Sequence, residues 1–365
     1  MGDAHRIGVV GLGVISRAYL DTLVGRDAVR VTAVADLDAS RSAAVAAELP
    51  GVRALSVEEL LNSPDVDTVL NLTVPAAHAE IALGAVARGK NVYGEKPLAA
   101  ELADAQAVLE AAAKASVRVG CAPDTVLGTG VQTARAAVEA GAIGRPLFAS
   151  AVMITPGHER WHPQPDFYYA PGGGPLLDMG PYYLTSLVHL LGPVRAVIGA
   201  SSRLRSERVI GSGPRAGERI PVEVDSHVSG VLEHEGGALT TLTTSFDGVG
   251  TTAAPMEVHG ETGTLTLPDP NHFDGEVGLL ELGGSERRAL PPSAGYVGGA
   301  RGVGLLDFVA ADGGRPARAS GELALHVLET MTALLRSSAE GRRIELSTSV
   351  ERPAPVPLTP EEQWR

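Results

Sequence analysis

The first third of the chain alternates short β-branched apolar runs with longer segments whose apolar residues recur every three or four positions. The short runs predict buried strands, and the longer segments predict helices. Strands are expected at 7–11, 29–35, 66–72, 91–93 and 117–121, and helices at 14–23, 39–49, 77–88 and 102–114. Strands that alternate with helices of this length indicate right-handed βαβ units, and therefore an α/β fold with a doubly wound parallel sheet.

After residue 121 the pattern changes to longer segments of alternating apolar and polar residues. Such segments predict an open, mostly antiparallel sheet. The strands are expected at 146–155, 196–203, 223–233, 238–246, 256–260 and 263–268, and helices at 125–140, 176–191 and 321–338. We therefore divide the chain into an α/β domain at 1–121 and an α+β domain at 122–365. Ser206–Pro221 is expected to be a mobile surface loop, and Pro353–Arg365 a tail.

Composition and charge narrow the class of protein. At 365 residues, with 44% hydrophobic and 20% charged residues, the chain suits two soluble globular domains. The net charge of −13 argues against nucleic acid or an anionic membrane surface as a partner. The single cysteine, Cys121, excludes an internal disulfide and is expected to be a small apolar filler. With no room for a signal peptide and no membrane-spanning apolar run, a cytoplasmic protein is expected.

A glycine-rich run lies between the first predicted strand and helix. In Gly11-Leu12-Gly13-Val14-Ile15-Ser16, the glycine pair permits a tight turn close to a pyrophosphate, and the helix N-terminus supplies N–H donors. Asp36 follows the second strand, where a carboxylate accepts both ribose hydroxyls of NAD and repels a 2′-phosphate. NAD is therefore the expected cofactor, while Ser40 and Arg41 leave NADP open. The predicted cofactor contacts here are Gly11, Gly13, Val14, Ile15 and Asp36.

Another loop at the carboxyl end of a predicted strand contains Thr73, Pro75 and His78. Ligands bind beside such loops in doubly wound sheets, so Thr73 and Pro75 are expected to flank the cofactor. For His78, which begins the next helix, the alternatives are a cofactor contact, a helix cap and a surface position.

Lys96 is one of only three lysines among the 30 lysine and arginine residues, and it lies in the run Glu95-Lys96-Pro97. Where charge alone would serve, this chain uses arginine. A lysine here indicates a role that needs a compact ammonium whose pKa can shift.

These motifs together resemble the glucose–fructose oxidoreductase / inositol dehydrogenase (Gfo/Idh/MocA) family. The resemblance rests on Gly11–Ser16, Thr73–His78, Gly89–Val92, Glu95–Pro97 and Gly172–Gly180. It implies an NAD(P)-dependent enzyme that transfers hydride to or from a secondary hydroxyl or carbonyl of a sugar, cyclitol or related polyol. It also implies that 1–121 is a Rossmann dinucleotide-binding domain. The second domain, 122–365, is then expected to bind substrate and to form a homodimer or homotetramer through its open sheet.

The resemblance also implies roles for the Glu-Lys-Pro residues. The lysine of this motif lies beside the nicotinamide in such enzymes, which carries over to Lys96. Glu95 is expected to contact the cofactor or orient Lys96, and the Lys96–Pro97 bond is expected to be cis.

Asp178 and Tyr182 lie four residues apart at the start of a predicted helix and therefore share one face. Many family members have a histidine at the position of Tyr182 as general acid/base. A phenol can take that role if an ammonium lowers its pKa, and Lys96 is the expected ammonium. We expect Lys96 to stabilise the oxyanion, Tyr182 to exchange the proton, and Asp178 to orient the pair or the substrate. A place in the core is the alternative for Tyr182.

A second cluster, in the loop before the Gly172–Gly180 run, contains His158, Trp161 and His162. Substrate contact and loop packing are the alternatives for these residues. Either histidine is an alternative acid/base, and Trp161 is suited to stacking on a sugar. The loop lacks the ligand spacing of a metal site, so no metal is expected.

Two further functions share this fold. A glycosidase would use NAD for transient oxidation and retain it tightly, and a sensor would bind dinucleotide and sugar without catalysis. The joint presence of Lys96, Asp178 and Tyr182 disfavours the sensor, which does not need all three.

Overall fold

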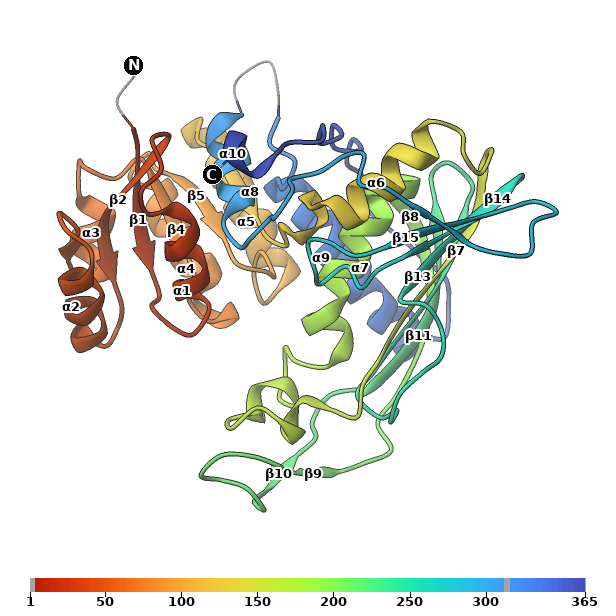
Figure 1. The fold of residues 1–365 in the computed structure, drawn as a ribbon. Coiled ribbons are helices and arrows are strands. Elements are labelled where there is room, and N and C mark those ends of the chain that lie inside the picture. Colours follow the sequence, from red (N-terminus) through yellow and green to blue (C-terminus); the bar gives the residue numbers. More distant parts are fainter. Residues whose placement is uncertain (1–3, 312–315, 365) are drawn as a thin grey trace. The chain divides into compact units, whose positions relative to one another are not determined.

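The computed structural model describes residues 4–311 and 316–364 and divides the chain into two compact units (Figure 1). Within the described part, the first unit comprises Met1–Leu127, Tyr296–Leu325 and Thr359–Arg365, and the second comprises Gly128–Gly295 and His326–Leu358. Two late segments of the chain therefore belong to the first unit, which the hydrophobic pattern does not indicate.

The first unit is built on a six-stranded parallel sheet in the order β3-β2-β1-β4-β5-β6. The order reverses between β1 and β4, as expected for a doubly wound sheet. Its strands are β1 (His5–Val10), β2 (Val29–Ala35), β3 (Arg53–Ala54), β4 (Thr68–Asn71), β5 (Asn91–Gly94) and β6 (Val119–Cys121). Its helices are α1 (Ser16–Leu23), α2 (Ala39–Glu48), α3 (Val57–Asn62), α4 (Pro75–Val86), α5 (Leu102–Ala115), the 3₁₀ turn η1 (Thr125–Leu127), α8 (Val303–Ala310) and α10 (Glu361–Trp364).

The core of the first unit explains why one late segment returns to it. Strands such as β1 and β2 are apolar on both faces, which suits a sheet covered by helices on both sides. The side chain of Phe308, from α8, is buried and packs edge-on against Tyr93 of β5, with their ring centroids 5.8 Å apart. The returning segment therefore completes the packing beside β5 and β6.

The second unit contains a nine-stranded sheet in the order β16-β15-β14-β13-β7-β12-β11-β8-β17. Only the pair β7 and β12 is parallel among its described strand pairs, so the predicted mostly antiparallel sheet is confirmed. Its strands are β7 (Pro146–Ile154), β8 (Val194–Ser202), β11 (His227–His234), β12 (Leu239–Ser245), β13 (Met256–Gly260), β14 (Gly263–Leu267), β15 (Val277–Glu281), β16 (Arg288–Leu290) and β17 (Ile344–Glu345).

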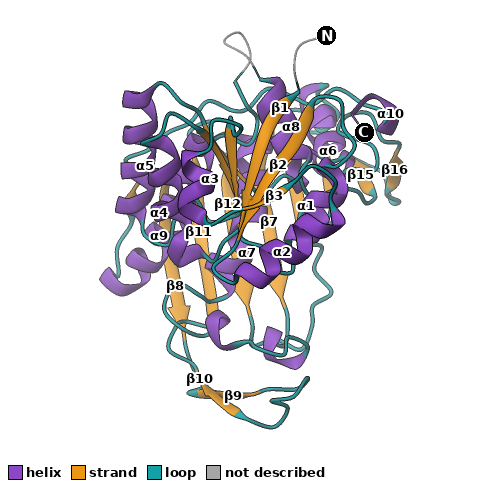
Figure 2. Ribbon diagram, turned by 90° about the vertical axis from the view of Figure 1, so that its left-hand side faces the viewer, coloured by secondary structure: helices purple, strands orange, loops and turns teal. Residues whose placement is uncertain are grey.

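The two faces of this sheet differ in their covering. Contacts join it to α6 (Thr129–Glu139), α7 (Pro175–Leu191) and α9 (Gly321–Glu340), which gather along one side of the strands (Figures 1 and 2). Residues that point to this side are buried. On the other side Phe148, Ile198 and Leu239 each leave about half of their surface exposed. We call this second side the open face.

Three expectations about local structure are wrong. Ser206–Pro221 forms an antiparallel ribbon of β9 (Glu207–Val209) and β10 (Arg219–Pro221), held by the buried Ile210 and Ile220. The helix expected at 125–140 is interrupted at Gly128, whose backbone is extended. Pro353–Arg365 is not a tail, because Val356 is buried and 361–364 form α10; residue 365 lies outside the described residues.

Candidate active site

The glycine turn after β1 is shaped for a close backbone approach. Gly11 has a φ of +93°, and a Cβ there would lie 2.6 Å from the backbone carbon of Leu72, so only glycine fits. Gly13 is exposed, with no atom within 4 Å of where a Cβ would be. Ser16 occupies the third position of the motif and donates its hydroxyl to the Gly13 carbonyl, with the two oxygens 2.7 Å apart. At the N-cap of α1, Ile15 provides no side-chain acceptor for the helix N–H groups, which suits an anionic ligand.

Asp36 lies directly after β2 and is tied to the same turn. One carboxylate oxygen accepts the N–H of Leu12 at 2.7 Å, and the other accepts the N–H of Asp38 at 2.9 Å. The carboxylate is therefore fixed in orientation, and each oxygen keeps acceptor capacity for a hydroxyl. Asp38 in turn accepts a hydrogen bond from Ser40 and lies 3.6 Å from the Arg41 guanidinium. Ser40 and Arg41, the candidate ligands for the 2′-phosphate of NADP, therefore already interact with the Asp38 carboxylate.

Three large apolar side chains project from the carboxyl ends of adjacent strands. Val14 and Leu37 are 99% exposed and Val74 is 67% exposed, following β1, β2 and β4 respectively. Single exposed apolar residues are ordinary, but three at one sheet edge can cover the apolar faces of a bound ring system. Together with the open space at Gly13 and the oriented Asp36, they fit a dinucleotide.

The loop after β4 is braced by His78. Thr73 donates its hydroxyl to Asn71 at 2.7 Å, and Pro75 is exposed at the start of α4. His78 is buried, not a cap or a surface residue; its Nδ1 lies 2.6 Å from the carbonyl oxygen of Pro97 and its Nε2 3.0 Å from that of Thr73. Both ring nitrogens are occupied, so the expected cofactor contact is replaced by an indirect role in holding the two loops together.

Glu95 fixes the backbone that carries Lys96. One of its carboxylate oxygens accepts the hydroxyl of Tyr19 at 2.8 Å, and the other accepts the N–H of Lys96 at 3.1 Å. Burial raises the pKa of Tyr19 well above its usual value, so this phenol remains a donor. The Lys96–Pro97 bond is cis, as the family resemblance implied. Lys96 is half-buried at the carboxyl edge that also carries the glycine turn.

In the second unit, the first turn of α7 brings Asp178 to His158. The Nε2 of His158 lies 3.0 Å from a carboxylate oxygen of Asp178. Close packing before α7 requires glycine at Gly173, because a Cβ there would lie 2.4 Å from the carbonyl oxygen of Phe167. Asp178 lies at the N-terminal end of the helix, where the backbone dipoles favour its negative charge. The sequence identified both residues as candidates but did not predict that they pair.

Aromatic rings surround His158. Its ring centroid lies 5.2 Å from that of Trp161, 4.7 Å from that of Tyr168 and 4.5 Å from that of Phe246. Trp161 is 59% exposed, while His162 accepts the N–H of Gln164 through Nδ1 at 3.1 Å. The exposed ring of Trp161 therefore lies beside a largely buried polar pair, His158 and Asp178.

A buried charge network, which the sequence did not reveal, holds this loop in place. Arg208 of β9 lies 2.5 Å from a carboxylate oxygen of Asp247 and 3.4 Å from one of Glu159, and Tyr169 donates its hydroxyl to Glu159. Burial and the neighbouring Glu159 carboxylate raise the pKa of Tyr169. Arg208 lies in a segment whose composition is typical of a loop. The only sequence signal that its surroundings are buried is the alternation of apolar and polar residues around Ile210.

The remaining candidates of α7 are buried. Tyr182 follows Asp178 by one turn and is 6% exposed. Tyr183 donates to Asp269 at 3.5 Å and its pKa is raised by burial, and His189 lies against Gln132 and Arg135. In the first unit Cys121 is buried, and burial raises the pKa of its thiol.

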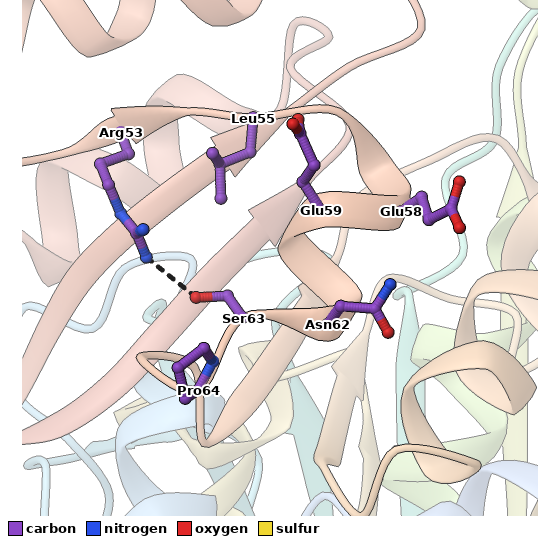
Figure 3. A pocket seen from close by; sticks show the side chains of 7 residues that line it. All are labelled: Arg53, Leu55, Glu58, Glu59, Asn62, Ser63 and Pro64. Carbon is purple, nitrogen blue, oxygen red and sulfur yellow. Dashed lines mark hydrogen bonds between the residues drawn. The ribbon is translucent and has the colours of Figure 1, made fainter.

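A separate surface pocket lies away from the glycine turn, between β3 and α3 (Figure 3). Ser63 accepts a hydrogen bond from Arg53 at 2.9 Å across it. Its lining residues include none of the predicted site residues; they are Arg53, Leu55, Glu58, Glu59, Asn62, Ser63 and Pro64. In the described ranges 4–311 and 316–364, no three His, Cys, Asp or Glu side chains are grouped to hold a metal ion. No described helix has both the length and the apolar character needed to cross a membrane.

Comparison with known proteins agrees with the nucleotide-binding fold that the first unit defines. Residues 5–122 match the oxidoreductase family with an NAD-binding Rossmann fold, and residues 131–266 match the GFO/IDH/MocA C-terminal domain. The chain is therefore an NAD-binding oxidoreductase. It belongs to the Gfo/Idh/MocA family.

Relatives are similar over most of their length. A 1,5-anhydro-D-fructose reductase from Ensifer adhaerens is 30% identical, with 95% of this chain and 100% of the relative covered. An inositol 2-dehydrogenase from Saccharopolyspora erythraea is 30% identical over 73% of each chain. A crystal structure of an NAD binding oxidoreductase from Klebsiella pneumoniae has the same fold, with a TM-score of 0.81, 23% identity, and coverage of 95% of this chain and 100% of that one.

Proposed function

We propose that this enzyme transfers hydride between NAD and a secondary hydroxyl or carbonyl of a sugar, cyclitol or related polyol. The observation that carries the proposal is Lys96, which Glu95 fixes at the same sheet edge as the glycine turn and Asp36. The names of the two relatives, a reductase of an anhydro sugar and a dehydrogenase of a cyclitol, support this substrate class.

In the proposed mechanism, Lys96, Tyr182 and Asp178 act on one bound substrate. NAD, when bound, supplies the group that accepts or returns hydride. During oxidation the carbon gives up hydride and the hydroxyl gives up its proton. Lys96 donates a hydrogen bond to the oxygen, which stabilises its developing negative charge. Tyr182 takes the proton as general base, and Asp178 orients the substrate. Reduction follows the same steps in reverse.

Other expected contacts belong to the same proposal. Gly11, Gly13, Val14, Ile15, Thr73 and Pro75 bind the cofactor, and Trp161 and His162 contact the substrate. Asp36 favours NAD over NADP because its fixed carboxylate repels a 2′-phosphate. We place the protein in the cytoplasm on the basis of its single buried Cys121. We further propose a homodimer or homotetramer formed through the open face.

The test is turnover by purified enzyme with NAD or NADH against a panel of sugars, cyclitols and anhydro sugars, in both directions, followed by absorbance of the reduced cofactor. Lys96→Met should lower kcat by about 10²–10³-fold with little change in NADH binding, because it removes one oxyanion donor of similar length. Lys114→Met, on an exposed helix position, serves as the matched control. Glycoside cleavage without net change in cofactor, or full activity of Lys96→Met, would contradict the proposal.

A further inference from the structure

The pairing of His158 with Asp178 bears on which group carries the proton. His158 comes from the loop before the glycine run and approaches the same carboxylate that precedes Tyr182 on α7. A histidine beside a catalytic carboxylate has two contrasting roles. It either exchanges a proton with the substrate itself, or it holds the carboxylate in place.

The two ring nitrogens of His158 have different surroundings. Nε2 faces the Asp178 carboxylate at 3.0 Å, and because a carboxylate only accepts, Nε2 carries the hydrogen. Nδ1 is buried and has no hydrogen-bond partner among the described residues. Its neighbours Trp161, Tyr168 and Phe246 lie around it as rings. A second proton on Nδ1 would therefore form a buried N–H with no acceptor, which is unfavourable.

The charged and titratable groups around the His158 ring agree with a ring that carries its hydrogen on Nε2 alone. Asp178 faces it from α7, and Tyr168 faces it from the 3₁₀ turn η3 (Asp166–Tyr168). Glu159 follows His158 in the 3₁₀ turn η2 (His158–Arg160), but its carboxylate is engaged by Tyr169 and by Arg208 of β9. Asp178 is thus the one carboxylate that His158 contacts in the described structure.

We infer that His158 is a positioning residue: a neutral imidazole whose Nε2–H fixes Asp178 and that carries no proton during catalysis. The inference rests on the proposed function, and it assigns the acid/base role to Tyr182 rather than to the histidine. Tyr182 is the proton carrier of the proposed function, and the imidazole of His158 serves to orient the carboxylate.

Replacement of His158 by glutamine or by asparagine distinguishes a positioning role from a proton-transfer role. The side-chain nitrogen of Gln reaches the place of Nε2, whereas that of Asn reaches only the place of Nδ1. If His158 positions Asp178, His158→Gln should keep kcat within about tenfold, while His158→Asn should lose about 10²-fold with a smaller change in KM. Both limbs of the pH–rate profile should stay in place in His158→Gln. If His158 carries the proton, both variants should lose about 10²–10⁴-fold equally and a limb of the profile should disappear.

A measurement independent of turnover uses the ring nitrogens. In ¹⁵N-labelled enzyme, with the His158 signals identified by their loss in His158→Gln, the shifts should show protonated Nε2 and unprotonated Nδ1 from pH 6 to 8. A titrating ring, or a hydrogen on Nδ1, would overturn the inference. This spectrum decides the point even if no sugar or polyol is turned over, so it separates failure of the inference from failure of the proposed function.

Discussion

Single side chains set the chemistry of the first unit, and Asp36 is the clearest case. Both of its carboxylate oxygens are held by backbone N–H groups, one from the glycine turn and one from its own loop. Such a carboxylate cannot rotate away from a ribose without losing these bonds. Its identity and its orientation both favour two free hydroxyls over a phosphate.

We therefore expect Asp36→Ala to weaken NAD binding by about 10–100-fold, the loss typical of hydrogen bonds to a charged group. Binding of NADP should weaken much less, so the ratio of the dissociation constants for NADP and NAD should fall. Calorimetric titration of both dinucleotides measures this directly. Asp27→Ala, which removes an exposed carboxylate just before β2, is the control. An unchanged ratio of the two dissociation constants in Asp36→Ala would contradict the assignment.

A buried histidine is expected to lower the free energy of unfolding at acid pH. His234, at the end of β11, places Nδ1 2.8 Å from the carbonyl of Gly192 and Nε2 2.9 Å from the hydroxyl of Thr240. Burial lowers its pKa from 6.5 to about 4. Above pH 6.5 the ring is neutral in both states. As the pH falls from 6.5 to 4 only the unfolded state takes up the proton, so folding loses about 3 kcal/mol.

The corresponding experiment is urea unfolding of the wild type and of His234→Gln at several pH values. The free energy of unfolding of the wild type should fall between pH 6.5 and 4. In His234→Gln this fall should be smaller by about 3 kcal/mol. His162→Gln, in an exposed part of the loop at 158–169, should leave the slope unchanged. Equal slopes in the wild type and in His234→Gln would refute the explanation.

At the scale of elements, the β9–β10 ribbon is held to the second unit by the Arg208 side chain. Asp247 and Glu159 both face this guanidinium, which is 3% exposed. Removal of one partner from a buried network leaves uncompensated charge. Arg208→Met should therefore lower the free energy of unfolding by about 3–5 kcal/mol.

Arg219 offers a matched control on the facing strand of the same ribbon. It pairs with Glu207 at the surface, and both side chains are largely exposed. Arg219→Met should therefore change stability by less than about 1 kcal/mol. Denaturant unfolding of the two variants measures the difference, and similar losses in both would argue against a special role for Arg208.

What the sequence predicted at this scale depended on local signals. The glycine turn and Asp36 were proposed as cofactor contacts because strand, turn and helix follow each other directly, and Lys96 because lysine is rare in this chain. The predicted strands and helices of the first sheet were confirmed, whereas β3 and α3 were not predicted. The pairing of His158 with Asp178 joins two segments 20 residues apart, which no local pattern encodes. The returning helix α8 is apolar, but an apolar pattern does not specify which sheet a helix will cover.

At the scale of the whole molecule, the open face is the surface that we expect to bind a second copy of the chain. Phe148 stacks on His259 with ring centroids 4.3 Å apart and remains 48% exposed. The neighbouring strands add Leu239 and Ile198 on the same side, in register with β7 and β11 respectively. Partly exposed apolar side chains on a broad sheet favour a second protein surface over water.

Phe148→Glu should therefore shift the oligomer toward monomer, with a dissociation constant raised by more than about tenfold, since it places a charge in the proposed interface. Light scattering coupled to size-exclusion chromatography gives the masses. Leu204→Glu, at a residue that is 91% exposed after β8, is the control for a general effect of added charge. A monomeric wild type, or no shift in Phe148→Glu, would exclude this face as the interface.

The hydrogen bond between Tyr19 and Glu95 has a consequence for the rate of the reaction. It ties the helix that begins at the glycine turn to the loop that holds Lys96. The backbone of Lys96 is therefore held relative to the glycine turn, which in the proposed mechanism restricts where the ammonium can lie before substrate binds. Negative charge that develops on the substrate oxygen would then meet a positive charge already in place, so little reorganisation energy would oppose the reaction. Tyr19, through its hydrogen bond to Glu95, would thereby help to lower the barrier.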